Sequence, residues 1–273
     1  MDVLLKKNVP IIFTSGTLTG PDGSYNCFEN DLGLRANVWK QSLTDGQICL
    51  SPYNYEKNSL FYYDSKITNP NDDHQKYLDE LVHEISKLIR ITNGRALVLF
   101  TSKKDMNYVY QHLDMGQFEF PIFLQDQKKS ISTICNDFEK NVKACLFATG
   151  AFWEGIDIKG RSLSHVIITR LPFAPVDAIM ETKANKFQNE KNPYIYDMLQ
   201  KMAQGTGRLI RSTHDVGIIS CLDSRYKHYS NYIENVLPFR YYTDNIDDVI
   251  DFSKCITNRD GKRGPYKLKK EKK

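Results

Sequence analysis

The sequence lacks several features that would assign it to common classes of protein. No apolar run is long enough to cross a membrane, and the first residues, MDVLLKK, do not have the profile of a signal peptide. The cysteines lie at positions 27, 49, 135, 145, 221 and 255, and no two form a C-x-x-C pair. We therefore expect no zinc or iron–sulfur site, no membrane partner and a reducing, cytoplasmic location, with Cys145 and Cys221 as buried thiols.

The sequence also lacks the two motifs with which many nucleotide hydrolases hold their substrate. It contains no G-x-x-x-x-G-K-[ST] loop to cradle phosphates and no D-E-A-H-like acidic segment to hold Mg²⁺. We expect that this chain alone does not hydrolyse a nucleotide.

Neither basic nor acidic residues are in clear excess until the end of the chain. The 273 residues are 41% hydrophobic and 26% charged, which is ordinary for a globular protein, and the net charge is +4. Residues 259–273 contain eight basic and two acidic residues, so the rest of the chain is close to neutral. We expect this tail to be disordered. It would either attract nucleic acid without specificity or keep the chain in solution.

Segments of strand and helix character alternate along the chain. Residues 73–91 have apolar side chains at helical spacing, whereas 95–101 is a continuous apolar run typical of a strand buried on both faces. Other strands are expected at 9–14, 46–50, 60–63, 121–124, 144–148, 164–169 and 217–222. Other helices are expected at 102–113, 130–139, 226–236 and 246–255, with two more within 177–211. The alternation predicts an α/β fold, a doubly wound, mainly parallel sheet with helices on both faces.

Distinctive residues follow several of these strands, where ligands bind in such sheets. The loops are residues 14–18, 101–102, 149–157 and 170–175. Each loop alone has an ordinary explanation, because a Ser or Thr after a strand commonly caps a helix. Phe152 and Trp153 fit core packing better than stacking on a base.

The segment QGTGRLIR, residues 204–211, is the most unusual part of the sequence. Its flanks are helical in pattern, and a spacing of three residues would place Arg208 and Arg211 on one side of a helix. Two guanidinium groups side by side suit a phosphate whose charge grows in a transition state. A solvated basic turn is the alternative.

Taken in order, these segments resemble the second motor lobe of superfamily-two helicases of the DinG/XPD-like family. FTSGTL resembles motif III, LVLFTS motif IV, GAFWEGIDIKG motif V and QGTGRLIR motif VI. The segment SPY at 51–53 fits the family's S-P-F stretch, and LPFAP is a DinG-type signature. Gly16 stands where the family usually has Ala. The resemblance covers roughly residues 8–240 and implies a RecA-like fold.

The resemblance also implies a domain organisation. Residues 1–20 would end a first motor lobe and include the motif III linker, 21–256 would form the second lobe, and 257–273 the basic tail. In the family, the phosphate loop and the acidic box precede motif III. The chain is therefore expected to be a fragment, and the missing first lobe would hold most of the ATP and Mg²⁺.

Roles for individual residues follow from the same resemblance. Arg208 and Arg211 would act as arginine fingers, with Gln204 bonding at the same interface. The nucleotide-binding residues would be Glu154, Asp157 and Gly207, although Glu154 could instead be a surface carboxylate. Contacts to single-stranded DNA are expected from Thr101, Ser102, Gly150, Phe152, Trp153 and Gly155. Ser15 and Thr17 would lie between the lobes, and no residue is expected to bind a metal.

Three functions remain open from the sequence. The first is the motor lobe of an ATP-dependent DNA helicase, whose partners would be single-stranded or forked DNA and its own first lobe. The second is a regulatory, nucleic-acid-binding module of a DinG-type 3'-5' exonuclease that does not itself unwind. The third is an unrelated α/β nucleotide-binding enzyme.

Overall fold

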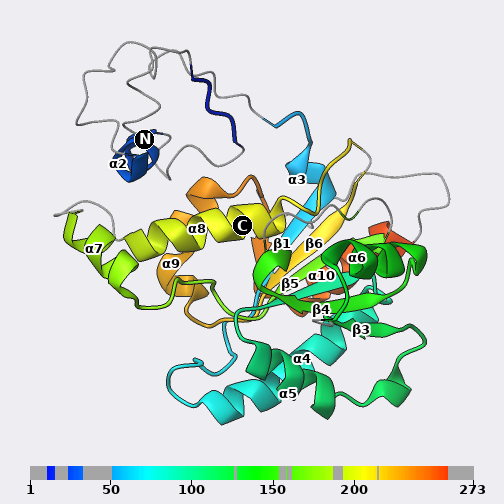
Figure 1. Cartoon of the computed structure of the whole chain (residues 1–273). Coiled ribbons are helices and arrows are strands. Elements are labelled where there is room, and N and C mark those ends of the chain that lie inside the picture. Colours follow the sequence, from blue (N-terminus) through cyan, green and yellow to red (C-terminus); the bar gives the residue numbers. More distant parts are fainter. Residues whose placement is uncertain are drawn as a thin grey trace, which may run out of the picture.

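The computed structural model describes residues 11–15, 24–32, 51–125, 128–153, 158, 162–186, 193–213 and 215–257. These residues form one seven-stranded sheet in which all paired strands are parallel, in the order β3-β4-β2-β5-β6-β1-β7 (Figure 1). The strands are β1 Ser59–Tyr63, β2 Ala96–Phe100, β3 Ile122–Leu124, β4 Cys145–Thr149, β5 His165–Ile168, β6 Gly217–Cys221 and β7 Tyr242–Thr243.

Helices cover both faces of the sheet. One face packs against α6 (Ile131–Lys140), α8 (Pro193–Thr206) and α9 (Tyr226–Val236). The other packs against α4 (His74–Ile91), α5 (Lys103–His112) and α10 (Ile246–Thr257). Leu97 and Leu99 of β2 belong to the first core, and Ala96, Val98 and Phe100 to the second. The predicted doubly wound sheet is confirmed, because alternate residues of a strand point to opposite faces.

Local signals explain where the long helices begin. Asp73 accepts a hydrogen bond from the Lys76 amide at 3.0 Å and caps α4, and Ser102 does the same for the Asp105 amide of α5 at 3.3 Å. Ser130 caps α6 by accepting from the Thr133 amide at 3.2 Å. A side-chain oxygen at this position satisfies an amide that has no partner within the helix. No described helix is long and apolar enough to cross a membrane.

Some predicted elements differ from the structure. Ile11–Ser15, the described part of the strand expected at 9–14, is irregular, and the Ile12 side chain is 90% exposed. A strand requires a neighbouring strand with which to pair. Within the described ranges, no strand pairs with Ile11–Ser15. The strand expected at 46–50 and the tail 259–273 lie outside the described residues.

Several short elements were not predicted. They are α2 (Asn26–Leu32), α3 (Tyr55–Asn58), the two-residue strand β7, and the 3₁₀ turns η3 (Met115–Gln117) and η4 (Gly150–Phe152). Elements of this length contain too few residues for a hydrophobic period to be visible. Of the two helices expected within 177–211, α7 (Ala178–Lys186) and α8 are present, but α8 ends at Thr206.

Candidate functional site

The loops that follow β2 and β4 lie together at the carboxyl edge of the sheet. Phe100 is in register with Thr149, so Thr101 and Gly150 are next to each other in neighbouring strand ends. Thr101 and Gly150 are both exposed. Gly150 has a φ of 57°, and a side chain there would meet nothing within 4 Å. This edge therefore presents a hydroxyl group and an open stretch of backbone, groups that can bind a phosphate.

Ser102 has a structural role at this edge, because its hydroxyl oxygen caps α5. The amino end of α5 therefore points toward the same edge and carries the positive end of the helix dipole. Gln125, which follows β3, was not predicted as a site residue. Its Oε1 accepts hydrogen bonds from the Thr149 amide at 2.7 Å and the Thr149 hydroxyl at 3.2 Å. Gln125 thereby fixes the backbone just before Gly150.

Phe152 and Trp153 do not present their rings to solvent. Phe152 is 0% and Trp153 5% exposed, and the Trp153 indole donates a hydrogen bond to the Phe100 carbonyl at 3.0 Å. Rings buried in this way are not available to stack on a base, which favours core packing for both side chains. Phe173, in the loop after β5, is half-buried and packs against Tyr229 and Arg225.

The two arginines of QGTGRLIR do not lie on a helix, contrary to the sequence prediction. Helix α8 ends at Thr206, and Arg208 and Arg211 follow in the irregular connection to β6. Two physical causes are visible. Gly205 and Gly207 have low helix propensity, and Asp215 binds the backbone beyond them. Its Oδ2 accepts hydrogen bonds from the Arg211 amide at 2.9 Å and the Ser212 amide at 2.7 Å.

The arginine segment packs against the loop that follows β4. A Cβ added at Gly205 would lie 3.0 Å from Trp153 Cε3, tighter than an ordinary contact, so the glycine lets the helix lie close against the ring. The Arg211 Nη1 donates a hydrogen bond to the Ile158 carbonyl at 3.3 Å. Leu209 and Ile210 are both 2% exposed and hold the segment on the core. The segments that resemble motifs V and VI are therefore in contact.

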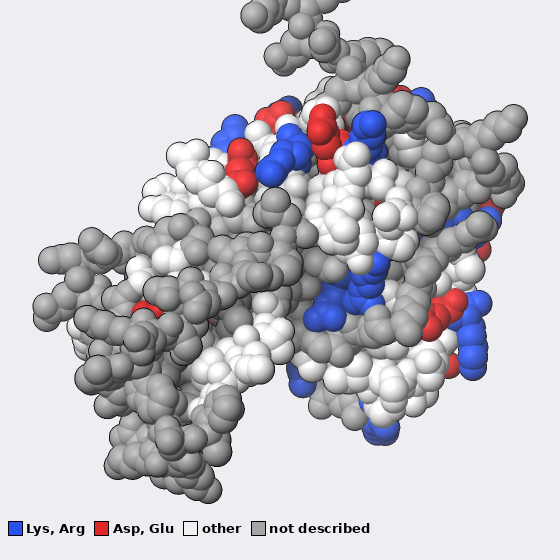
Figure 2. All heavy atoms as spheres, turned by 90° about the horizontal axis from the view of Figure 1, so that it is seen from above, with Lys and Arg blue, Asp and Glu red and all other residues white. Residues whose placement is uncertain are grey.

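The polar groups of this region are partly withdrawn from solvent. Arg208 and Arg211 are half-buried, whereas Gly207 is exposed. The Gln204 Oε1 atom is buried and accepts no hydrogen bond from the described residues. Figure 2 shows one group of basic side chains near the middle of this view, while along the upper rim basic and acidic side chains lie side by side.

Four of the predicted site residues lie outside the described residues. They are Thr17, Glu154, Gly155 and Asp157. Ser15 is described and exposed. Within the described ranges, no group of three His, Cys, Asp or Glu side chains could hold a metal ion.

A buried ion pair anchors the loop after β5, and sequence reasoning missed it. Asp223 is 0% exposed and accepts hydrogen bonds from the Leu171 amide at 2.9 Å and from Arg225 Nη2 at 2.6 Å. The Arg225 guanidinium lies 5.4 Å from the centre of the Phe173 ring. The only signal in the sequence was an acid and an arginine two residues apart directly after a strand.

The fold and this arrangement of segments define a class, the RecA-like motor lobe of helicases. Residues 85–239 match the family model of the helicase C-terminal domain. The chain belongs to that family, as the C-terminal domain of a DinG/XPD-like superfamily-two helicase.

Individual relatives agree with this assignment. The chain is 29% identical over 262 residues to the ATP-dependent helicase DinG of Mycobacterium tuberculosis (strain ATCC 25618 / H37Rv). The aligned region covers 92% of this chain and 38% of that protein. It is 28% identical over 260 residues to the 3'-5' exonuclease DinG of Staphylococcus aureus (strain MSSA476), covering 93% of this chain and 28% of that protein. The chain thus spans well under half the length of these relatives.

Among solved structures, an XPD helicase has a similar fold. The TM-score is 0.54 at 18% sequence identity, over 69% of this chain and 36% of that one. At this identity the likeness supports the fold alone.

Proposed function

We propose that this chain is the second motor lobe of an ATP-dependent DNA helicase, and that Arg208 and Arg211 act on a nucleotide held mainly by a first lobe. The observation that carries the proposal is the contact between the arginine segment and the loop after β4, made by Arg211 with the Ile158 carbonyl and by Gly205 with Trp153. The relatives, which include an ATP-dependent helicase, support the same function.

On the nucleotide side, Arg208 and Arg211 would stabilise the charge that develops on the γ-phosphate of ATP. A finger of this kind is worth on the order of 10³–10⁵ in rate. The buried Gln204 Oε1 has an acceptor position to spare for the same interface. Glu154, Asp157 and Gly207 would complete the nucleotide contacts, and Ser15 and Thr17 the contacts between lobes. Mg²⁺ would be held mainly by the first lobe.

On the DNA side, Thr101, Ser102, Gly150 and Gly155 would contact the phosphates of a single strand. Exposure of Thr101 and the open space at Gly150 support this role. Phe152 and Trp153 would support the DNA-contacting backbone from within the core. Trp153 donates to the Phe100 carbonyl, directly before Thr101, and its ring packs on Gly205 at the end of α8. One buried ring therefore contacts both proposed sites.

The experiment that tests this function substitutes the arginines in the two-lobe protein. Arg208→Ala and Arg211→Ala should each lower the DNA-stimulated ATPase kcat on the order of 10³-fold. The Kd for single-stranded DNA should change by less than about twofold, since neither arginine is among the residues proposed to contact DNA. Arg90→Ala, an exposed arginine on α4, is the matched control and should retain wild-type turnover. Wild-type turnover in both arginine variants would show that neither is a finger.

A regulatory module of an exonuclease is the second candidate, because one relative is a 3'-5' exonuclease. This function requires no strand separation. ATP-dependent unwinding of a forked duplex by the two-lobe protein separates the candidates, since the motor lobe predicts it and the regulatory module does not.

A further inference from the structure

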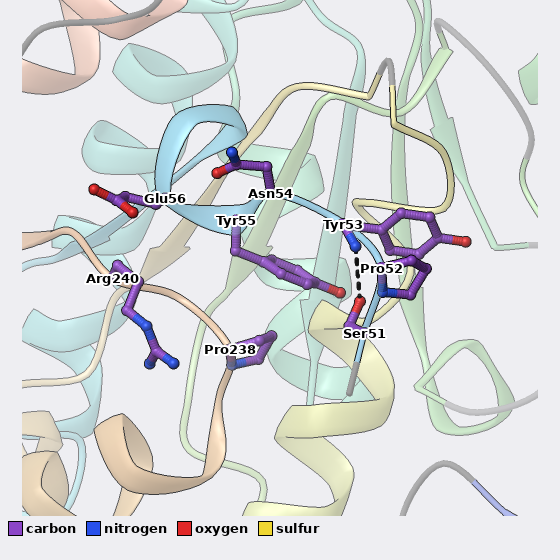
Figure 3. A pocket seen from close by; sticks show the side chains of 8 residues that line it. All are labelled: Ser51, Pro52, Tyr53, Asn54, Tyr55, Glu56, Pro238 and Arg240. Carbon is purple, nitrogen blue, oxygen red and sulfur yellow. Dashed lines mark hydrogen bonds between the residues drawn. The ribbon is translucent and has the colours of Figure 1, made fainter. Parts of the chain in front are cut away.

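A pocket of about 470 Å³ lies where the chain enters β1 and β7 (Figure 3). Its walls are the segment 51–56 on one side and Pro238 with Arg240 on the other. Figure 3 shows the Tyr55 ring in the middle, with Tyr53 and Pro52 to one side and Glu56 and Arg240 to the other. This volume is within the range of about 300–1,000 Å³ that is usual for small-molecule sites.

The aromatic wall of the pocket is held in place by the core. The Tyr55 ring meets the buried Phe239 ring edge to face, with centroids 5.7 Å apart, and the Ser59 hydroxyl donates to the Tyr55 carbonyl at 2.6 Å. The centroids of the Tyr53 and Tyr55 rings are 6.5 Å apart, and the planes of the two rings make an angle of 63°. Two rings at this angle offer a flat ligand one face on which to stack and one edge to meet.

The pocket also carries an anion and a cation that do not neutralise each other. Glu56 and Arg240 are both exposed, and neither forms an ion pair with a described residue. Among the described residues, the Arg240 guanidinium donates a hydrogen bond to the Phe239 carbonyl at 3.4 Å. Burial raises the pKa of the Tyr55 hydroxyl, so this group remains a hydrogen-bond donor. Rings, a carboxylate, a hydroxyl and a guanidinium together match a nucleotide, which brings a base, a ribose and negative charge.

The pocket is joined to the connection that carries the arginines, and it lies at the opposite end of the strands from Thr101 and Gly150. Asn58, in the same short helix as Tyr55 and Glu56, donates from Nδ2 to the Thr213 carbonyl at 3.3 Å, two residues beyond Arg211. The pocket lies at the amino end of β1. A strand of five residues extends about 16 Å, and this length separates the pocket from the carboxyl edge where Thr101 and Gly150 lie.

We propose that this pocket binds the base of the nucleotide whose phosphates Arg208 and Arg211 face. The inference rests on the proposed function and extends it to a base-recognising subsite. The base stacks on the Tyr53 and Tyr55 pair, the Glu56 carboxylate accepts a hydrogen bond from an exocyclic amino group, and Arg240 faces the negative charge. Adenine, which has such an amino group, is preferred over hypoxanthine, which lacks it.

Equilibrium titration of the two-lobe protein with ATP, ITP and inorganic tripolyphosphate tests this subsite without requiring turnover. Tyr53→Ala should raise the Kd for ATP about tenfold and leave the Kd for tripolyphosphate unchanged, because tripolyphosphate has no base. Glu56→Ala should remove the preference for ATP over ITP. Lys57→Ala, an exposed neighbour on the same helix that does not line the pocket, is the control and should bind all three ligands like the wild type.

Two results would overturn the subsite. Either Tyr53→Ala and Glu56→Ala both bind ATP and ITP as the wild type does, or they weaken binding of single-stranded DNA and leave the Kd for ATP unchanged, which would assign the pocket to a DNA base. Loss of the proposed function has a different signature. In that case Arg208→Ala retains full turnover, whatever the pocket variants do.

Discussion

At the scale of single residues, His165 is a titratable group that is fully enclosed within the core. Its ring is 0% exposed and lies between the Ser220 hydroxyl, 2.7 Å from Nε2, and the Thr92 hydroxyl, 3.3 Å from Nδ1. Burial lowers the pKa of His165 to about 3. The ring is therefore neutral in the folded protein under ordinary conditions, and protonation favours the unfolded chain.

This burial predicts a pH dependence of stability. The folded pKa is below the unfolded value of about 6.5, so the unfolded state takes up the proton first and stability falls as the pH drops below that value. Between pH 7.5 and 5.5, the wild type should lose about 1.4 kcal/mol of unfolding free energy that His165→Gln does not lose. Urea unfolding at both pH values measures this difference.

The control for this experiment is His83→Gln, at an exposed position on α4. The His83 variant should show the same change between the two pH values as the wild type. An equal pH dependence in His165→Gln and the wild type would mean that His165 is protonated in the folded protein or is not buried.

Some roles of single residues could not be predicted from the sequence. The residue types at 152 and 153 allowed both core packing and base stacking, and only the position of α8 over Trp153 decides between them. The sequence predicted Ser102 as a cap because capping is local. It did not predict the roles of Gln125 or Asp223, because their partners, Thr149 and Leu171, are 24 and 52 residues away along the chain.

At the scale of elements, the connection between α8 and β6 determines how the arginines are presented. The Asp215 carboxylate holds the Arg211 and Ser212 amides, and Leu209 packs against Gly217 at the start of β6. The connection is therefore a fixed turn and does not continue the helix. The same turn brings Arg211 to the Ile158 carbonyl.

We expect Asp215 to be a positioning residue for the proposed chemistry. Asp215→Ala removes the acceptor of two backbone hydrogen bonds, which costs about 1–3 kcal/mol of unfolding free energy. It should lower the ATPase kcat of the two-lobe protein about tenfold, because a small displacement of a catalytic group costs that much or more. KM for ATP and affinity for single-stranded DNA should remain close to the wild-type values.

Asp215→Asn supplies the comparison, since its amide oxygen can still accept a hydrogen bond. This variant should recover most of the lost kcat. Equal turnover in the wild type and Asp215→Ala would show that the turn does not position the arginines.

Most elements could be predicted because their signals are local and strong. β2 is flanked on both sides by β4 and β5, and its five residues are all buried, so a continuous apolar run identified it. The end of α8 was predicted too late, because the helical pattern of Leu209 and Ile210 reflects core packing of an irregular segment. The expected strand at 9–14 was wrong over its described part, because an apolar run alone does not supply a pairing partner.

At the scale of the whole molecule, the two proposed sites use different parts of one sheet. Thr101 and Gly150 follow strands, whereas Arg208 and Arg211 precede one, and Trp153 contacts the backbone next to both groups. This arrangement suits a lobe that meets DNA at one edge and a nucleotide at another. The chain also covers only 38% of the length of a DinG relative. In the proposed function, the chain would supply one part of an active site that it shares with a first lobe.

The measurement that tests this claim most directly is ATP hydrolysis by the purified 273-residue chain in the presence of single-stranded DNA, beside the two-lobe protein. In the proposed function, Arg208 and Arg211 would stabilise a transition state, but they would not replace a phosphate-binding loop and its Mg²⁺. We predict no DNA-stimulated turnover above background from this chain, and robust turnover from the two-lobe protein. DNA-stimulated hydrolysis by the 273 residues alone, abolished by Arg208→Ala, would contradict the shared active site.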